Sequence, residues 1–270
     1  MYITNDPIIA QIAQQSGVNW IFIDLERIGK AERQAQVDSV ISNHSFDDIA
    51  KLRRVIDSSK LLVRINPMHE DTPNEIEQVL ALGADIIMLP YFKTAYEVEF
   101  FLHLLQGRAK SCLLLETPSA VDHLEAILRI PGIDYIHIGL NDLHLGYGMK
   151  FMFELLADGT VEKLCMAIKK KGIPYGFGGI AQIGQGLLPA EYILAEHYRL
   201  GSQMVILSRS FCNAKHETID KIEKMFRAGV SQIREYESQM LSKNSAFFCS
   251  QHIEITQKVK DIIHLMKGAK

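Results

Sequence analysis

Charged and amide side chains stand at the ends of several short apolar runs in this chain. They are Asp24 as the last residue of 20–24, Glu26 and Arg27 just after that run, Arg64 within 61–65, Glu116 after 111–115, and Asn141 and Asp142 after 135–139. Two carboxylates, completed by water and a chelating substrate, suit a hard octahedral cation such as Mg²⁺ or Mn²⁺. We therefore interpret Glu116 and Asp142 as candidate metal ligands; neither has a Cys or His at ligand spacing, which argues against zinc. Arg64 carries a planar guanidinium that suits a carboxylate.

A recurring unit indicates which elements would position these residues. A helical stretch ends at a glycine, and a short run rich in β-branched or aromatic residues follows within a few positions. Glycine just past a helix supplies the left-handed cap conformation, and repetition of helix, short loop and strand is typical of parallel β/α architecture. The predicted strands are residues 1–4, 20–24, 61–65, 85–89, 111–115, 135–139, 174–177 and 203–207.

Eight strands that alternate with helices predict an α/β fold, a closed (β/α)₈ TIM barrel, over residues 1–211. An open doubly wound sheet usually has fewer strands and often a glycine-rich first turn. No GxGxxG or GxxxxGK[ST] motif follows any of the strands, which weakens nucleotide-binding interpretations. Catalytic groups of such barrels lie at the C-terminal ends of the strands. On position alone, Glu116, Arg64 and Asp24 could instead form an ion-pair network that closes the barrel mouth.

The chain continues well beyond the eighth strand. Residues 212–270 are predicted to form a helical extension, with one helix around 216–241 and a second around 253–266. An apolar stripe runs along the second helix and must bury against another surface. Its members are Ile255, Val259, Ile262, Ile263 and Met266. The stripe packs either on its own barrel or on a neighbouring subunit, to which residues 244–250 could carry it; we expect a homo-oligomer.

Composition argues against several classes of function. The net charge of −3 leaves no large basic field for nucleic acid or an anionic membrane, so we expect neither as a partner. No apolar stretch approaches the roughly 20 residues that span a bilayer, and the N-terminus has no signal-peptide pattern. The four cysteines show no CxxC spacing, which argues against a zinc site or a disulfide framework. We expect a cytoplasmic protein.

Several segments resemble one known family. They are Phe22-Ile-Asp-Leu-Glu26, Val63-Arg64, Gly83 through Pro90, Glu116-Thr-Pro, and Ile130 through Leu143, in family order and spacing. The chain is similar to the HpcH/HpaI aldolase and citrate lyase β-subunit family from about the first helix to the eighth strand. The resemblance implies a phosphoenolpyruvate/pyruvate-type barrel whose divalent metal is held by Glu116 and Asp142.

The resemblance also implies how a substrate is held. Arg64, with backbone amides near Asn141 and Asp142, would bind the carboxylate of a small anionic 2-oxo acid and stabilise an enolate. Retro-aldol cleavage of a 4-hydroxy-2-oxo acid leaves negative charge on the pyruvate oxygen, where a divalent metal and a guanidinium would act. Glu26 is a further candidate for substrate binding, and Asp24 is a further candidate for catalysis.

One position departs from the aldolase branch. That branch has a histidine directly after the strand-two glutamate, where it serves the acid–base step, and Arg27 stands at this position here. Arginine is always protonated and cannot act as a general base. The candidate replacements are His144, His69 and metal-bound water, of which we favour His144; Arg27 could instead bind an extra anionic group. His137 lies within a strand and is expected to be a core histidine.

Three hypotheses for function follow. The first is a metal-dependent carbon–carbon lyase or aldolase that yields pyruvate or a related enolate. The second is a citrate-lyase-like lyase or synthase of acyl thioesters, because that branch also lacks the histidine and has a run similar to Val63-Arg-Ile-Asn66; no basic cluster marks a coenzyme A cleft, however. The third is a barrel that binds a metabolite without chemistry, which the joint presence of Glu116, Asp142 and Arg64 argues against. We favour the first.

Overall fold

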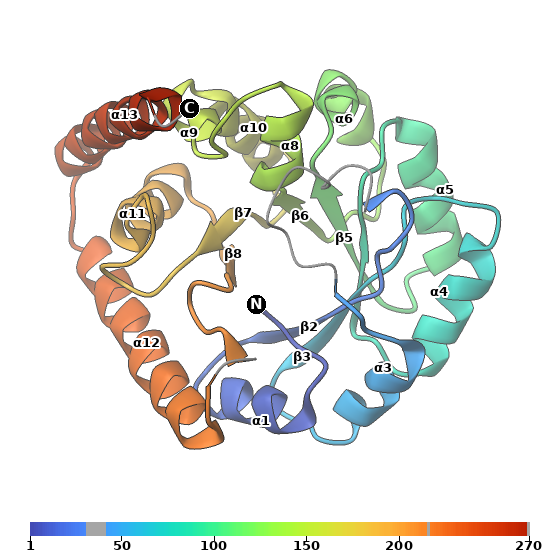
Figure 1. The fold of residues 1–270 in the computed structure, drawn as a ribbon. Helices are drawn as coiled ribbons and strands as arrows, with labels where there is room; N and C mark the ends of the chain where they lie inside the picture. The colour runs from blue at the N-terminus through green and yellow to red at the C-terminus, as the bar shows by residue number, and fades with distance from the viewer. Residues whose placement is uncertain (31–41, 215–216, 269–270) are drawn as a thin grey trace. The chain divides into compact units, whose positions relative to one another are not determined.

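The computed structural model describes residues 1–30, 42–214 and 217–268. Its strands follow one another in the order β1 to β8 as a closed parallel barrel, so the predicted fold class is confirmed. Each strand overlaps its predicted range (Figure 1). The strands are β1 Tyr2–Ile3, β2 Trp20–Asp24, β3 Lys60–Arg64, β4 Ile86–Leu89, β5 Lys110–Leu115, β6 Tyr135–Ile138, β7 Tyr175–Ile180 and β8 Met204–Leu207.

Helices follow the strands along the chain, and several begin at a side chain that caps the first turn. Asp6 accepts the N–H groups of Ile8 and Ile9 at the start of α1, for example. The helices are α1 Pro7–Gln15, α3 Phe46–Arg53, α4 Thr72–Ala81, α5 Ala95–Leu105, α6 Pro118–Asp122, α7 Leu124–Ile127, α8 Leu140–Gly146, α9 Glu154–Ala157, α10 Thr160–Lys169, α11 Ala190–Leu200, α12 Ile219–Met240 and α13 Ser245–Gly268. None of the helices in the described ranges is both long and apolar enough to cross a bilayer.

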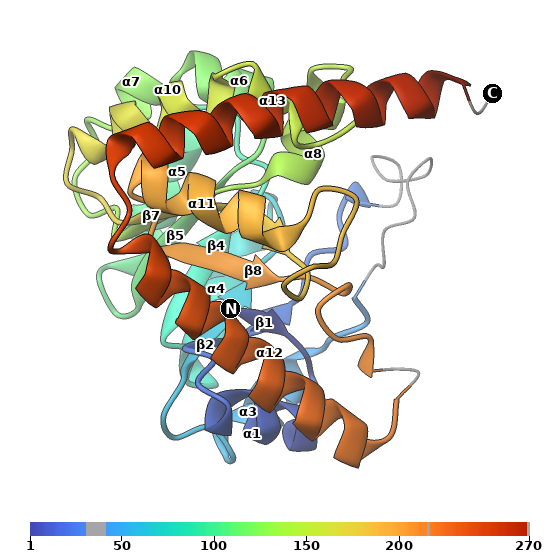
Figure 2. The ribbon, with the colours of Figure 1, turned by 90° about the vertical axis from the view of Figure 1, so that its left-hand side faces the viewer.

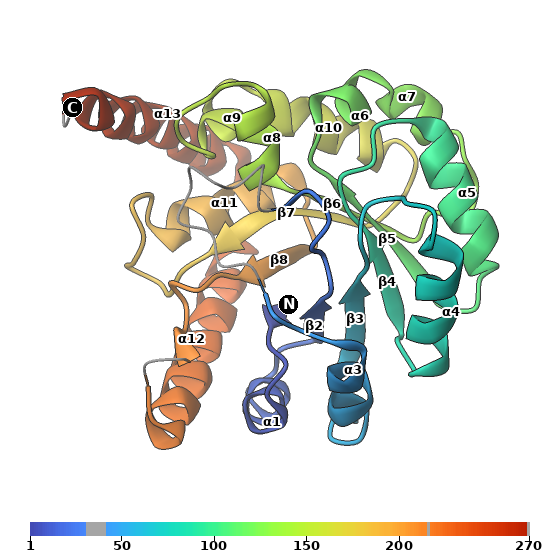
Figure 3. The same cartoon turned by 45° about the vertical axis from the view of Figure 1, so that its right-hand side comes forward.

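Residues 1–137 form the first of two compact units. Figure 3 shows β2, β3, β4 and β5 of this unit side by side, with α3, α4 and α5 outside them. The strand interiors are continuous apolar runs with almost no exposed surface, as expected for parallel strands covered on both faces. The register pairs Asp24 with Arg64 and Arg64 with Met88, so the polar residues that end β2 and β3 lie directly opposite each other.

Residues 138–270 form the second unit, which contains β7 and β8. Gly176 is required where these strands pair, because a Cβ atom there would come within 2.1 Å of the Met204 carbonyl oxygen. The predicted separation of a barrel over 1–211 from an extension over 212–270 stays a prediction.

The C-terminal extension is helical, and its last helix starts earlier than predicted. Residues 245–250 belong to α13, so their predicted role as a connector is wrong; Asn244 caps the helix by accepting the N–H of Phe247. His216, the predicted start of the preceding helix, lies outside the described residues. Figure 2 shows α13 alongside α11, and α13 contacts both α11 and α9 of its own unit.

The apolar stripe of α13 divides into two parts. Ile255 and Val259 are fully buried, so this part of the stripe packs on its own chain. Farther along the helix, Ile262 and Ile263 are half-buried and Met266 is 38% exposed, while Leu265, which lies outside the predicted stripe, is 72% exposed. Docking of this distal part on a neighbouring subunit stays a prediction.

Candidate functional site

The strand register brings Asp24 and Arg64 into a two-pronged ion pair at the ends of β2 and β3. Nε of Arg64 donates to Oδ1 of Asp24 at 2.8 Å, and Nη2 donates to Oδ2 at 2.8 Å. The guanidinium carbon also lies 5.4 Å from the centre of the Phe22 ring. Bidentate pairing and the aromatic contact together fix the plane of the guanidinium.

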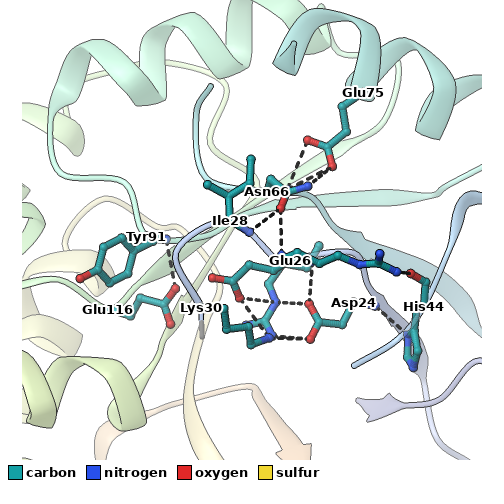
Figure 4. A network of polar contacts seen from close by, with 11 residues as sticks. Asp24, Glu26, Ile28, Lys30, His44, Asn66, Glu75, Tyr91 and Glu116 are labelled. Atoms are coloured by element: carbon teal, nitrogen blue, oxygen red, sulfur yellow. Dashed lines mark hydrogen bonds and ion pairs between the residues drawn. The ribbon is translucent and has the colours of Figure 1, made fainter. Parts of the chain in front are cut away.

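Glu26 and Lys30 complete this cluster (Figure 4). Lys30 Nζ lies 2.8 Å from Asp24 Oδ2 and 3.3 Å from Glu26 Oε2, and Arg64 Nε also lies 3.3 Å from Glu26 Oε2. Asp24, Glu26 and Lys30 are 2%, 1% and 4% exposed, so these charges interact with little screening by water. Of the three residues in the ion-pair network considered from the sequence, Asp24 and Arg64 are paired with each other, and Glu26 and Lys30 join them.

The network determines the charge states of its members. Burial alone would raise the pKa of Asp24, but the Arg64 guanidinium and the Lys30 ammonium hold it well below its usual range. Burial alone would lower the pKa of Arg64, but the carboxylates of Asp24 and Glu26, with a further contribution from Glu116, raise it. Asp24 is therefore ionised at any pH where the protein would work, and it orients Arg64 rather than exchanging protons.

The turn after β2 is tied to neighbouring segments. Asn66 Oδ1 accepts the backbone N–H groups of Arg27 and Ile28 at 2.9 and 3.1 Å. The Arg27 side chain donates through Nη2 to the His44 carbonyl oxygen at 2.8 Å and to Asn43 Oδ1 at 3.3 Å. The residue that stands in place of the family histidine thus fastens residues 43–44 to this turn.

His44 lies against the backbone of β2. Its Nδ1 accepts the N–H of Asp24 at 3.0 Å, which places the ring proton of the neutral form on Nε2. Burial lowers the pKa of His44. His44 is therefore a neutral hydrogen-bond acceptor whose Nδ1 lone pair is already used by the backbone, so it does not supply the missing general base.

Glu116 follows β5 and is held by the end of β4. Its Oε1 accepts the backbone N–H of Tyr91 at 3.0 Å (Figure 4). Glu116 is 3% exposed and adds to the rise in the pKa of Arg64, so the carboxylate acts on the same guanidinium as Asp24. Within the first unit, the structure thus brings Glu116 into the same electrostatic environment as Asp24, Glu26 and Arg64.

In the second unit, Asn141 and Asp142 lie in the first turn of α8. Where this helix begins, the N–H of Leu143 donates to the carbonyl oxygen of Gly139. Gly178 of β7 packs against this turn, because a Cβ atom at Gly178 would come within 2.8 Å of a methyl carbon of Leu140. Backbone amides in the first turn of a helix are groups that can bind a carboxylate.

The candidate histidines differ in their tautomers. His144 lies in α8 and is 6% exposed; its Nδ1 lies 3.2 Å from the Leu140 carbonyl oxygen, which leaves the lone pair on Nε2. His69 accepts the N–H of Asp71 at Nδ1, and its Nε2 lies 3.1 Å from Oε2 of Glu75 in α4, so both ring nitrogens are engaged. His137 is 1% exposed, which agrees with the expected core position.

The donor set of Glu116 and Asp142 fits a magnesium-type ion. No three His, Cys, Asp or Glu side chains gather into a metal-binding group among the described residues. A zinc site needs three or four protein ligands, whereas Mg²⁺ binds through one or two carboxylates and completes its coordination with water and substrate. The carboxylate oxygens of Glu116 and Asp142 are donors of the kind that such an ion takes.

Sequence reasoning missed Lys30 and His44, and it gave Asn66 no role although Asn66 directly follows the predicted strand 61–65. Neither Lys30 nor His44 ends a predicted strand, and each reaches the cluster from a turn or a following segment. Lys30 stands four residues after Glu26, a spacing that pairs charges in helices, but here a turn and not a helix brings the two together.

Known proteins resemble the chain in sequence and in fold. The chain is 27% identical over 174 residues to a 4-hydroxy-2-oxovalerate aldolase of Novosphingobium aromaticivorans, a match that covers 53% of this chain and 60% of that protein. It is 25% identical over 172 residues to a 2-keto-3-deoxy-L-rhamnonate aldolase of Salmonella gallinarum, covering 52% of this chain and 58% of that protein. The chain thus spans about 60% of the length of each relative.

A solved structure shares the fold. It is an HpcH/HpaI aldolase/citrate lyase family protein from Burkholderia cenocepacia, with a TM-score of 0.62 and 16% identity; the match covers 88% of this chain and 94% of that one. The sequence model of HpcH/HpaI aldolase/citrate lyase matches residues 2–175. Because that match takes in more than half of the chain, the protein belongs to the HpcH/HpaI aldolase/citrate lyase family.

Proposed function

We propose that this protein is a divalent-metal-dependent carbon–carbon lyase of the aldolase type, which acts on 4-hydroxy-2-oxo acids through the enolate of pyruvate or a related 2-oxo acid. The observation that carries the proposal is the buried Arg64 guanidinium, whose Nε–Nη2 edge is fixed by Asp24. Among the described residues none accepts a hydrogen bond from Nη1 of Arg64, so this outer edge can receive a substrate carboxylate. Membership of the family and the two aldolase relatives support the same reaction class.

In the proposed reaction, the first unit supplies the fixed positive charge of Arg64. In the retro-aldol direction, the C3–C4 bond breaks, its electron pair forms the C2–C3 double bond of the enolate, and the C4 hydroxyl loses its proton to give an aldehyde. Arg64 already has its orientation from Asp24, so it need not reorganise as charge develops on the substrate. The enolate then takes a proton at C3 and leaves as the 2-oxo acid.

The other candidate residues have defined parts in this proposal. A Mg²⁺ or Mn²⁺ ion held by Glu116 and Asp142 would polarise the 2-oxo group and stabilise the enolate charge. Amides of Asn141 and Asp142 would bind the substrate carboxylate together with Arg64. His144 stays our candidate acceptor for the hydroxyl proton, because its Nδ1 contact with Leu140 leaves the lone pair on Nε2.

A second candidate is a lyase or synthase of acyl thioesters. The observation that favours it is Arg27, which stands where the aldolase branch has its histidine and which serves here to fasten residues 43–44. Chemistry on a thioester also passes through an enolate, so the same carboxylates and guanidinium would serve it.

The experiment that separates the two candidates is a cleavage assay. Purified protein with MgCl₂ or MnCl₂ is incubated with a panel of 4-hydroxy-2-oxo acids of increasing chain length, and with 3-hydroxyacyl coenzyme A thioesters in parallel. The proposal predicts metal-dependent release of a 2-oxo acid, detected with lactate dehydrogenase, and no release of thioester products. Cleavage of the thioesters alone would establish the second candidate in place of the first.

A further inference from the structure

Lys30 is a buried charge that the proposed mechanism does not use. Its Nζ lies 2.8 Å from Asp24 Oδ2 and 3.3 Å from Glu26 Oε2. Arg64 contacts the same two oxygens, through Nη2 at 2.8 Å and Nε at 3.3 Å. Two cations and two carboxylates therefore alternate in a closed ring, in which each cation faces both carboxylates. Figure 4 shows Lys30 beside the carboxylates of Asp24 and Glu26.

The turn after β2 is built so that Lys30 folds back onto this ring. The backbone N–H of Lys30 donates to the Arg27 carbonyl oxygen at 3.2 Å, which closes the turn. Asn66 then holds the turn through the N–H groups of Arg27 and Ile28, at 2.9 and 3.1 Å. These bonds tie the position of Lys30 to the end of β3, the strand that carries Arg64.

The ring controls what Arg64 can bind. Breaking a buried ion pair is costly because it leaves a charge without a partner. Without Lys30, the carboxylates of Asp24 and Glu26 would lose a cation that both contact, so more of their attraction would fall on Arg64, whose Nε–Nη2 edge already binds Asp24. The guanidinium would then turn toward Glu26 and withdraw its outer edge from an incoming anion.

We propose that Lys30 is a positioning residue for anion binding, which neutralises Asp24 and Glu26 and thereby keeps the outer edge of Arg64 for the carboxylate of the substrate. The inference rests on the proposed function for the identity of that anion. It also predicts that the effect of Lys30 on the substrate passes through Glu26, whose carboxylate lies 3.3 Å from both Lys30 and Arg64. A lysine with a merely structural part would alter stability without a specific effect on substrate binding.

The test follows the Mg²⁺-dependent exchange of the methyl protons of pyruvate for deuterium in D₂O by mass spectrometry. This half-reaction needs only enolisation, so it requires no knowledge of the aldehyde. Lys30→Met is expected to raise the KM for pyruvate by at least ~10-fold, with a smaller change in kcat, because a charge-assisted bond to the substrate is weakened. The matched control is Lys110→Met, which removes a lysine that is 63% exposed and pairs with Asp134 at the start of β5; its KM is expected to equal that of the unchanged protein.

A double variant tests the route through Glu26. Glu26→Gln combined with Lys30→Met restores the charge balance of the ring, so its KM is expected to lie within about threefold of that of Glu26→Gln alone. If Lys30→Met by itself does not fold, the comparison of the double variant with Glu26→Gln still tests the role of Lys30. A Lys30→Met variant with an unchanged KM for pyruvate would overturn the inference. A double variant whose KM is tenfold higher than that of Glu26→Gln alone would also overturn it.

Failure of the proposed function is a separate outcome. If the unchanged protein exchanges no methyl protons of pyruvate, the aldolase proposal is contradicted. Calorimetric titration with oxalate, a rigid dicarboxylate, then tests Lys30 independently of turnover. Weaker binding to Lys30→Met than to the unchanged protein and to Lys110→Met supports the inference, and any other order of affinities overturns it.

Discussion

Tyr91 holds Glu116 through its backbone while it adopts a left-handed conformation. Its N–H donates to Glu116 Oε1 at 3.0 Å, and its φ of +50° lies in a region that residues with a side chain rarely occupy. Such strain persists only where surrounding contacts maintain it, and it gathers at functional sites. Here it turns an amide after β4 toward the carboxylate that follows β5.

The strain at Tyr91 can be measured by comparing two small residues. Both Tyr91→Gly and Tyr91→Ala remove the ring and keep the N–H that Glu116 accepts. Because glycine adopts positive φ without penalty, we expect Tyr91→Gly to be more stable than Tyr91→Ala by about 1 kcal/mol. Urea unfolding measures the difference, and an alanine variant as stable as the glycine variant would show that position 91 stores no strain.

Glu116 and Asp142 are predicted to hold one divalent ion. Glu116→Gln or Asp142→Asn is expected to weaken Mn²⁺ binding by at least ~10-fold, because an amide oxygen carries no charge for a hard cation. Calorimetric titration with MnCl₂ measures the affinity, and Glu125→Gln, which removes a carboxylate that is 84% exposed, is the control. Equal affinities in all four proteins would place the ion elsewhere.

Asp48 is predicted to make stability depend on acid pH. Burial raises its pKa, but hydrogen bonds from Asn5, Lys51 and Ser45 lower it from 3.8 to about 2. A carboxyl whose pKa is depressed on folding stabilises the protein above its unfolded pKa, and this contribution is lost as pH falls through the folded pKa.

The stabilisation by Asp48 is therefore present above about pH 4 and disappears as the pH falls toward about 2; it amounts to about 2 kcal/mol. In Asp48→Asn, the free energy of unfolding should fall less steeply over that window, measured by urea titration at several pH values. Asp47→Asn, in the same helical turn, should keep the steep fall; identical pH profiles for all three proteins would refute the assignment.

The distal end of α13 is predicted to lie in a homo-oligomer interface. Leu265 is 72% exposed, and burial of this apolar surface would favour association. Leu265→Asp, or a chain that ends at residue 260, is expected to reduce the oligomer, while Ile255 and Val259 stay in place on their own unit. Light scattering decides: a monomeric full-length chain at micromolar concentration, or an oligomer that neither change affects, would contradict the prediction.

Strand positions and the residues that end the strands could be read from the sequence. Apolar runs after glycine caps identify parallel strands, and their C-terminal ends must lie at one edge, so Arg64, Asp24 and Glu116 were found without a structure. The register that pairs Asp24 with Arg64 is seen only in the structure. These inferences depend on local periodicity and on a rule of the fold.

Lys30 and His44 could not be found in the same way. Their positions depend on side chains of other segments, namely Asn66 for the turn that carries Lys30 and Arg27 for the segment that carries His44. A single sequence shows neither hydrogen bond. The tautomer of His144 is likewise invisible until α8 is seen to begin at Leu140, because its Nδ1 partner is the carbonyl oxygen of that residue.

Deuterium exchange into pyruvate tests the central claim most directly. The account predicts that the protein with Mg²⁺ incorporates solvent deuterium at the pyruvate methyl group, and that Arg64→Lys lowers kcat/KM for this exchange by about 10- to 100-fold while the fold is retained, because one charge-assisted hydrogen bond contributes about 1.5–3 kcal/mol. Arg53→Lys, which alters an arginine paired with Asp85, is the matched control and should exchange normally. Exchange in Arg64→Lys at the rate of the unchanged protein would contradict the account.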